Sequence, residues 1–273
     1  MDSALQVISW SLRKEFILSL NRKKVLVTND DGINGEGLNV LVDSLKKVAD
    51  VYVLAPDSNR SAVSSKITMG QAFTFQKHGE GIFSCNGMPA DCVNIGLISS
   101  LFGVKFDVVV SGINSGPNMG TDVVYSGTCA AARQAVLKGV PGIAVSLESK
   151  YFDYDNDDDG FNFKPLADFT ANNLDELISL CDGDVFVSLN ATSADSYKEA
   201  AFASLCIRDY SDNFPVKSEG EDLFTGHFTS DGLSVTGEAD SDYNIARSGK
   251  IAISLIYAEP VMKRPERSVK FKF

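Results

Sequence analysis

A short apolar run that stops at two adjacent aspartates constrains this chain more than any other stretch. Residues 24–38 read KVLVTNDDGINGEGL, and the apolar run at 25–27 is typical of a parallel strand buried on both faces. Asp30 and Asp31 follow this run directly after Thr28 and Asn29. We therefore expect both carboxylates at the carboxyl end of the first strand of an open α/β sheet, where such sheets bind ligands.

Two neighbouring carboxylates at such a position point to a divalent cation. A phosphate in the crevice would be repelled by Asp30 and Asp31 unless a cation lay between them. The pair therefore predicts a divalent metal. The alternative is that one of the two aspartates only caps the following helix, as Asx residues often do.

Strand-like and helix-like periodicity alternate along residues 23–192. Apolar runs predict further buried strands at 51–55, 107–110, 142–146 and 185–189. Apolar residues at helical spacing predict helices near 38–50, 89–101 and 128–138 and from 165 onward. This alternation predicts an α/β, Rossmann-like, doubly wound and mostly parallel sheet. Residues 62–86 are expected to form an irregular excursion with short strands at 67–68 and 72–75.

Polar residues that follow successive parallel strands are expected to meet at one edge of the sheet, because right-handed crossovers return every strand in the same direction. Asp30 and Asp31 follow the first strand, and Ser61 and Asn114 follow the next two. Carboxylate, hydroxyl and amide oxygens suit a hard cation such as Mg²⁺ or Mn²⁺ and suit zinc poorly. We expect one such cation, with water or substrate completing its coordination.

A phosphate also needs hydrogen-bond donors, and two segments offer them. Ser126, Gly127 and Thr128 open an alanine-rich helix, whose free amides and positive dipole end can bind an anion. The loop at 114–120 adds the side chain of Asn118 and several glycine amides. The alternative is that Ser126 and Thr128 only cap the helix and that the glycine loop is only a tight connection.

Five strings in the chain resemble the motifs of the SurE survival protein family: VTNDDGI, APDSNRSAVSSKIT, NGMPADCV, VVVSGINSGPNMGTDVVYSGTCAAARQAVLKGVPGIAVS and DSDYNIARSGKIAISLIY. The resemblance implies that the metal ligands are Asp30, Asp31, Ser61 and Asn114. It implies phosphate or substrate contacts at Asn118, Ser126, Gly127 and Thr128, to which we add Asn29. The chain departs from the family pattern at five positions, which leaves substrate preference open: Asn34, Gly35, Glu36, Ala62 and Met88.

The activity implied by this resemblance is metal-dependent hydrolysis of nucleoside 5'-monophosphates, with Asp30 and Asp31 as the catalytic residues. The alternative is a non-catalytic, stress-response protein that binds metal and nucleotide. A dinucleotide-dependent oxidoreductase is disfavoured, because the glycines at 32, 35 and 37 give G-x-x-G-x-G and not G-x-G-x-x-G. A serine hydrolase is disfavoured because the chain lacks G-x-S-x-G.

Outside the catalytic core, we expect an N-terminal extension at 1–22 and a C-terminal hairpin and oligomerisation region at 193–273, packed on the core. Hairpin strands are expected at 224–229 and 233–236 around a turn at 230–232. By the resemblance, this region implies a homodimer or homotetramer. The acidic loop at 152–160 resembles the start of a calcium loop, but position 166 is leucine where a glutamate is needed, so a solvated loop is favoured.

Charge and cysteine usage narrow the partners and the compartment. A net charge of −11 argues against a nucleic-acid duplex as partner. The five cysteines include no C-x-x-C pair, and we expect most of them to be core residues in a reducing compartment, the cytoplasm. No apolar segment is long enough to span a bilayer, so no membrane partner is expected.

Overall fold

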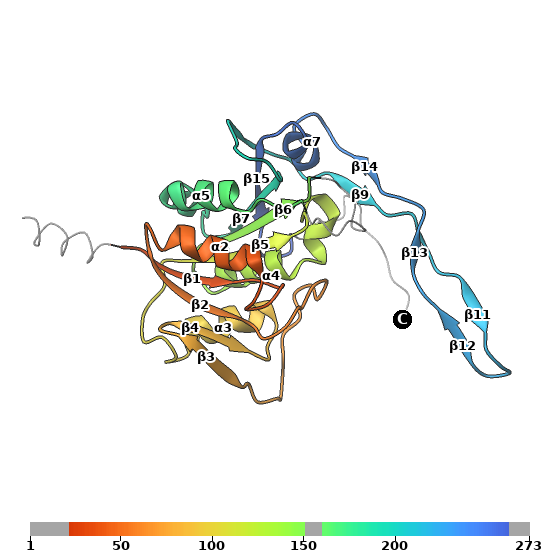
Figure 1. Ribbon diagram of the computed structural model, residues 1–273, viewed down its shortest axis with the longest axis horizontal. Coiled ribbons are helices and arrows are strands. Elements are labelled where there is room, and N and C mark those ends of the chain that lie inside the picture. The colour runs from red at the N-terminus through yellow and green to blue at the C-terminus, as the bar shows by residue number, and fades with distance from the viewer. Residues whose placement is uncertain (1–21, 151–159, 262–273) are drawn as a thin grey trace, which may run out of the picture.

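The computed structural model describes residues 22–150 and 160–261 (Figure 1). The predicted N-terminal extension, apart from Arg22, lies outside the described residues, and so does the acidic loop, apart from Gly160.

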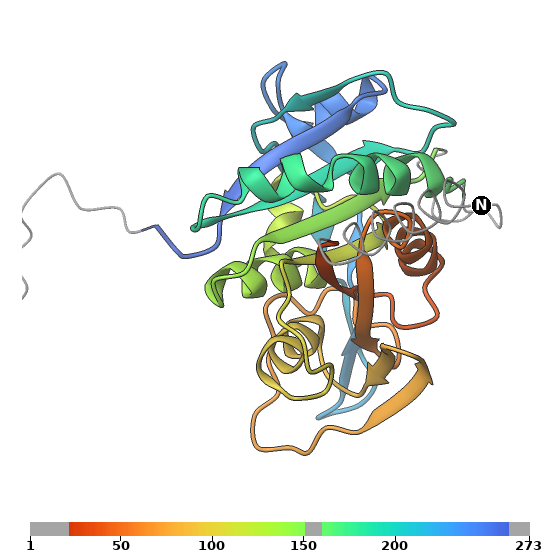
Figure 2. The same cartoon turned by 90° about the vertical axis from the view of Figure 1, so that its left-hand side faces the viewer.

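A sheet of nine strands, counted over the described residues, forms the centre of the molecule (Figure 2). From one edge to the other its strands are β3 (Phe75–Gly79), β4 (Ile82–Cys85), β2 (Asp50–Pro56), β1 (Lys24–Thr28), β5 (Val108–Ser115), β6 (Gly142–Glu148), β7 (Val185–Thr192), β15 (Ile251–Tyr257) and β8 (Ala200–Phe202). The strands from β4 to β7 are all parallel, as predicted. The chain builds outward from β1 through β2 and β4, then crosses back to β5, so the switch point of the doubly wound sheet lies between β1 and β5.

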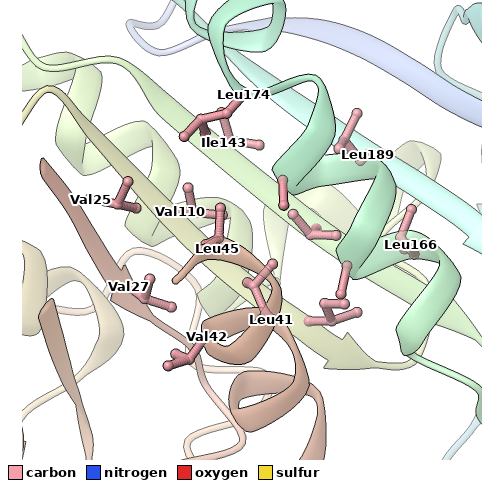
Figure 3. Packing of buried hydrophobic residues seen from close by; sticks show 14 of the residues in the cluster. Val25, Val27, Leu41, Val42, Leu45, Val110, Ile143, Leu166, Leu174 and Leu189 are labelled. Atoms are coloured by element: carbon pink, nitrogen blue, oxygen red, sulfur yellow. The ribbon is translucent and has the colours of Figure 1, made fainter. Parts of the chain in front are cut away.

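Helices cover both faces of the sheet, as the alternation predicted. They are α2 (Glu36–Leu45), α3 (Pro89–Ile98), α4 (Gly127–Leu137), α5 (Lys164–Asn172), α6 (Leu174–Leu180) and α7 (Asp242–Arg247). Successive residues of a strand point to opposite faces. Accordingly, Val25 and Val27 pack in a core with residues of α2, α5 and α6 (Figure 3), whereas Leu26 packs in a separate core with residues of α3 and α4. Burial on both faces explains why β1 is apolar from Val25 to Val27.

Two predictions in the first half of the chain need correction. The third predicted strand continues as β5 to Ser115, so Asn114 lies within a strand, past a register shift against β6, and not in a following loop. The short strands predicted at 67–68 and 72–75 do not form. The amide of Thr68 instead donates to the carboxylate of Asp91. Strand pairing in this segment begins at Phe75, where β3 pairs with β4 in antiparallel orientation.

The hairpin predicted around residues 230–232 is wrong, because its two strands have other partners. Residues 207–236, which we call the hairpin arm, form one long hairpin that extends away from the sheet (Figure 1). Its pairs are β9 (Ile207–Asp209) with β14 (Ser234–Thr236), β10 (Asp212–Asn213) with β13 (Thr229–Ser230), and β11 (Val216–Ser218) with β12 (Phe224–Gly226). Residues 230–232 are an irregularity in the returning limb, opposite Ser211, and the reversal lies at 219–223.

The sheet does not end at the predicted boundary at residue 192. β15 pairs with β7 over six residue pairs in an antiparallel register, and β8 adds to β15. The C-terminal part of the chain therefore supplies two strands of the sheet as well as the hairpin arm. Within the described ranges, no helix has the length and apolar character needed to cross a bilayer.

Candidate active site

Asp30 lies at the carboxyl end of β1 and is held by the first turn of α4. The residue is 3% exposed, and its carboxylate accepts two hydrogen bonds from Thr128, one from the hydroxyl at 2.5 Å and one from the amide at 3.1 Å. Gly127 leaves room for this contact, because a Cβ there would lie 2.9 Å from Asp30 Oδ2. The local sequence Gly127–Thr128 therefore brings the start of α4 against the aspartate.

Asp31 connects β1 to the end of β5, since its Oδ2 accepts a hydrogen bond from the amide of Ser115 at 3.2 Å. Burial raises the pKa of both carboxyls. For Asp30 the pKa rises to about 6, with the neighbouring charge of Asp31 adding to burial and the hydrogen bonds from Thr128 opposing it. A cation bound between the two carboxylates would favour their ionised forms and so offset the effects of burial and of their mutual repulsion.

Ser61 and Asn114 reach the same place from the neighbouring strands. The loop after β2 is tied to the site because the amide of Arg60 donates to the Asp30 carbonyl at 2.7 Å. Asn114 Nδ2 donates to the carbonyl of Gly116 at 2.9 Å, which leaves Oδ1 as the atom for a ligand. Asp30, Ser61 and Asn114 line one pocket of about 430 Å³. Asp31 is linked to that pocket through Ser115, which also lines it.

The residues predicted to contact phosphate fall into two groups. Asn118 and Ser126 line the pocket, although Asn118 Nδ2 already donates to Ser146 at 2.8 Å and Ser126 Oγ caps α4 by accepting from the amide of Cys129 at 3.0 Å. Asn29 and Thr128 have structural roles: Asn29 exchanges two hydrogen bonds with the backbone of Gly32, and Thr128 bonds to Asp30. Ser126 therefore caps α4 and also lines the pocket, and Thr128 orients the aspartate.

Sequence reasoning missed another part of the pocket wall, formed by Asp122, Tyr125, Tyr210 and Asp212. Asp122 and Tyr125 lie in or next to the short helix η1 (Gly120–Val124), within the longest string that resembles the family, and that string was the signal available. Tyr210 and Asp212 come from the hairpin arm. Periodicity gave no indication that this segment returns to the pocket.

The side chains present fit a hard cation and do not fit a soft one. Within the described part of the chain, no group of three or more His, Cys, Asp and Glu residues could hold a metal ion. A cation at the two carboxylates would be completed by hydroxyl, amide or water oxygens, a donor set that suits Mg²⁺ or Mn²⁺. The pocket volume is in the range of small-molecule sites.

Fold and pocket together define a Rossmann-like α/β protein with an acidic, all-oxygen donor site at the switch point of its sheet. The profile of a family described as survival protein SurE matches residues 25–212. The chain belongs to this family, as the sequence strings predicted.

Individual relatives agree with the family assignment. The 5'-nucleotidase SurE of Treponema pallidum is 45% identical over 189 residues, which are 68% of this chain and 99% of the relative. The 5'-nucleotidase SurE of Idiomarina loihiensis is 34% identical over 249 residues, 88% of this chain and 94% of the relative. The crystal structure of the SurE protein from Aquifex aeolicus is similar with a TM-score of 0.74 at 26% identity, covering 87% of this chain and 94% of that one.

Proposed function

We propose that this protein is a metal-dependent 5'-nucleotidase, a phosphomonoesterase that hydrolyses nucleoside 5'-monophosphates to nucleoside and phosphate. The observation that carries the proposal is the adjacent aspartate pair at the switch point, with Asp30 buried in the wall of a ligand-sized pocket. The similarity to proteins named 5'-nucleotidase SurE supports the same activity. These names favour an enzyme over the alternative of a non-catalytic binding protein.

Asp30, Asp31, Ser61 and Asn114 would hold the cation, and Mg²⁺ or Mn²⁺ suits this set. When bound, it supplies positive charge that neutralises phosphoryl oxygens and makes a water more acidic. Thr128 keeps the Asp30 carboxylate oriented toward the pocket by its two hydrogen bonds. Asp31, whose Oδ2 accepts from the amide of Ser115, is placed to orient the attacking water. The start of α4 favours negative charge at the phosphoryl group.

The experiment that tests this proposal is phosphate release from AMP with Mn²⁺ present, comparing the wild type with Asp31→Asn and a matched control. We expect Asp31→Asn to lower kcat/KM by at least about 100-fold, because it removes one of two charges that hold the cation. Asp43→Asn removes an exposed aspartate on α2 and should leave the activity unchanged. A protein that binds Mn²⁺ and AMP but releases no phosphate would be the non-catalytic binder.

We further propose that the chain acts as a homodimer or homotetramer in the cytoplasm. Exposed apolar side chains on the hairpin arm, among them Phe214, Phe224 and Phe228, support self-association. The cysteines carry free thiols, and Cys85 and Cys92 remain free although their sulfurs lie 3.5 Å apart. Free thiols of this kind are typical of a reducing compartment.

A further inference from the structure

One part of the pocket wall has no role in the chemistry described above. Tyr210 and Asp212 come from the hairpin arm and Asp122 comes from η1, and all three line the pocket that also holds Asp30. The pocket thus has a cation end, formed at the sheet, and a second end formed by the base of the hairpin arm. The second end offers an aromatic ring and two carboxylates.

The ring of Tyr210 is held in place by a buried ion pair. Its hydroxyl donates to Asp122 Oδ2 at 2.6 Å and accepts from Arg208 Nε at 3.2 Å, while the same Nε lies 2.8 Å from Asp122 Oδ2. The guanidinium of Arg208 also lies over the ring, 5.6 Å from its centroid. Tyr210 remains 38% exposed. Arg208 therefore lies against one face of the ring, and the residue keeps exposed surface where it lines the pocket.

Arg208 is itself fixed more firmly than a surface residue of a hairpin would be. Its side chain is 2% exposed, and its backbone exchanges two hydrogen bonds with the hydroxyl of Thr121, at 2.8 and 3.1 Å. Its Nη1 is buried and has no hydrogen-bond partner among the described residues. The arrangement keeps Tyr210 at one position against the pocket.

The charges of the pocket wall determine which end of a substrate lies against the hairpin arm. Asp122 is already paired with Arg208, so no cation among the described residues at this end is left to attract a phosphoryl group. Asp212 repels a phosphoryl group and accepts hydrogen bonds from hydroxyl and amino groups, which a ribose and a nucleobase carry. The phosphoryl group of a nucleotide is attracted instead to the cation end, beside Asp30. A nucleoside 5'-monophosphate therefore fits the pocket in one direction only.

We propose that Tyr210 is the residue on which the nucleobase stacks, with Arg208 and Asp122 as positioning residues that hold its ring. The ligand class is a purine or pyrimidine nucleoside with a free ribose. This inference rests on the proposed function and adds the element that recognises the nucleoside. It also makes the hairpin arm part of the substrate site.

The test compares two substrates that share the phosphate ester and differ only in the base, AMP and ribose 5-phosphate. For each variant the ratio of kcat/KM for AMP to kcat/KM for ribose 5-phosphate is measured. We expect Tyr210→Ala to lower this ratio about tenfold, the size of one lost base–aromatic stacking contact. Tyr210→Leu, which keeps apolar volume without an aromatic face, should give a similar loss. Tyr210→Phe keeps the ring but removes the hydroxyl that bonds to Asp122 and Arg208, so we expect a loss that is measurable and smaller than in Tyr210→Ala.

A matched control is Tyr257→Ala, which removes an exposed tyrosine at the end of β15, outside the pocket wall. Its ratio should equal that of the wild type. An unchanged ratio in both Tyr210→Ala and Tyr210→Leu would overturn the proposal. An equal loss of kcat/KM for both substrates would overturn it too, because a merely structural role produces that result.

Adenosine binding, measured by calorimetry on the wild type and Tyr210→Ala, separates this proposal from the proposed function. We expect the affinity for adenosine to fall about tenfold in the variant even if no phosphate release occurs. Absence of metal-dependent phosphate release with adenosine binding intact would defeat the 5'-nucleotidase proposal alone. Equal adenosine affinity in the two proteins would defeat the assignment of Tyr210.

Discussion

Gly127 decides how closely α4 can approach the aspartate pair. A Cβ at this position would lie 2.9 Å from both Cβ and Oδ2 of Asp30, closer than real Cβ contacts. The residue is glycine because the start of the helix and the carboxylate share one small space, and no unusual backbone angle is involved. The hydrogen bonds from Thr128 to Asp30 depend on that approach.

Replacing Gly127 by alanine should therefore damage the site without unfolding the protein. We expect Gly127→Ala to lower kcat/KM for AMP by about 10- to 100-fold, because a displacement of the carboxylate by a fraction of an ångström misplaces the cation. Phosphate release measures the effect, and circular dichroism checks the fold. Gly220→Ala is the matched control, since a Cβ at Gly220 meets nothing within 4 Å. Full activity in Gly127→Ala would contradict the assignment of Asp30 as a ligand.

The hydroxyl of Thr128 also determines how the Asp30 carboxylate is oriented. Thr128→Val keeps the shape of the side chain and removes the hydrogen bond to Asp30 Oδ1. A hydrogen bond to a charged group contributes about 1.5–3 kcal/mol, so we expect the affinity for Mn²⁺ to fall by at least about tenfold. Calorimetric titration with Mn²⁺ measures the change, and Thr225→Val on the exposed hairpin arm serves as control. Equal affinities would show that Thr128 does not orient the ligand.

At the scale of elements, close contact between α4 and β6 holds one face of the sheet together. A Cβ at Gly142, the first residue of β6, would lie 2.1 Å from the carbonyl oxygen of Ala132 in α4. The alanine-rich sequence of α4 serves the same purpose, because small side chains allow the helix to lie near the strands. This contact lies away from the pocket and concerns stability.

Gly142→Ala should lower the stability of the protein and leave its activity unchanged. We expect the free energy of unfolding to fall by about 1–3 kcal/mol, the usual cost of inserting a methyl group into a filled space. Urea denaturation measures this loss, and kcat/KM for AMP at a temperature below the transition should stay near the wild-type value. An unfolding midpoint equal to that of the wild type would mean that helix and strand can move apart at no cost.

In the molecule as a whole, the hairpin arm extends beyond the sheet, and many of its side chains remain exposed. Phe214 and Phe228 contact each other with ring centroids 4.8 Å apart, yet both remain exposed. The base of the hairpin arm is fixed to the pocket through Arg208 and Tyr210, whereas the rest extends outward (Figure 1). An association between copies through this segment would bury the exposed rings.

The oligomer prediction follows at this scale. We expect light scattering to give the mass of a dimer or tetramer for the wild type, and a shift toward the monomer for Phe224→Asp, since burying an unpaired charge opposes association. Ile98→Asp places the same charge on an exposed apolar residue of α3, outside the hairpin arm, and should leave the mass unchanged. A monomer mass for the wild type would contradict the oligomer.

Local sequence patterns were sufficient to predict a strand wherever burial on both faces of the sheet produced an uninterrupted apolar run. The strands β1, β2, β6 and β7 were predicted for this reason, and with them the parallel sheet and the placement of Asp30, Ser61 and Asn114 at one edge. Sequence patterns did not predict the strand pairing of the hairpin arm, because its exposed strands do not alternate apolar and polar residues. The turn sequence at 230–232 therefore suggested the wrong pairing.

The sequence by itself determined which segments are strands and which are crossovers, because local periodicity identifies them. It therefore also determined which oxygen donors share one edge of the sheet, because crossovers between parallel strands are right-handed. The tertiary structure alone decided what each polar atom bonds to. Thr128 turns to Asp30, Asn29 closes a turn on Gly32, and Tyr210 returns to the pocket from a segment 82 positions beyond Thr128. Such partners depend on distances between residues far apart in the chain, and only the packed fold sets those distances.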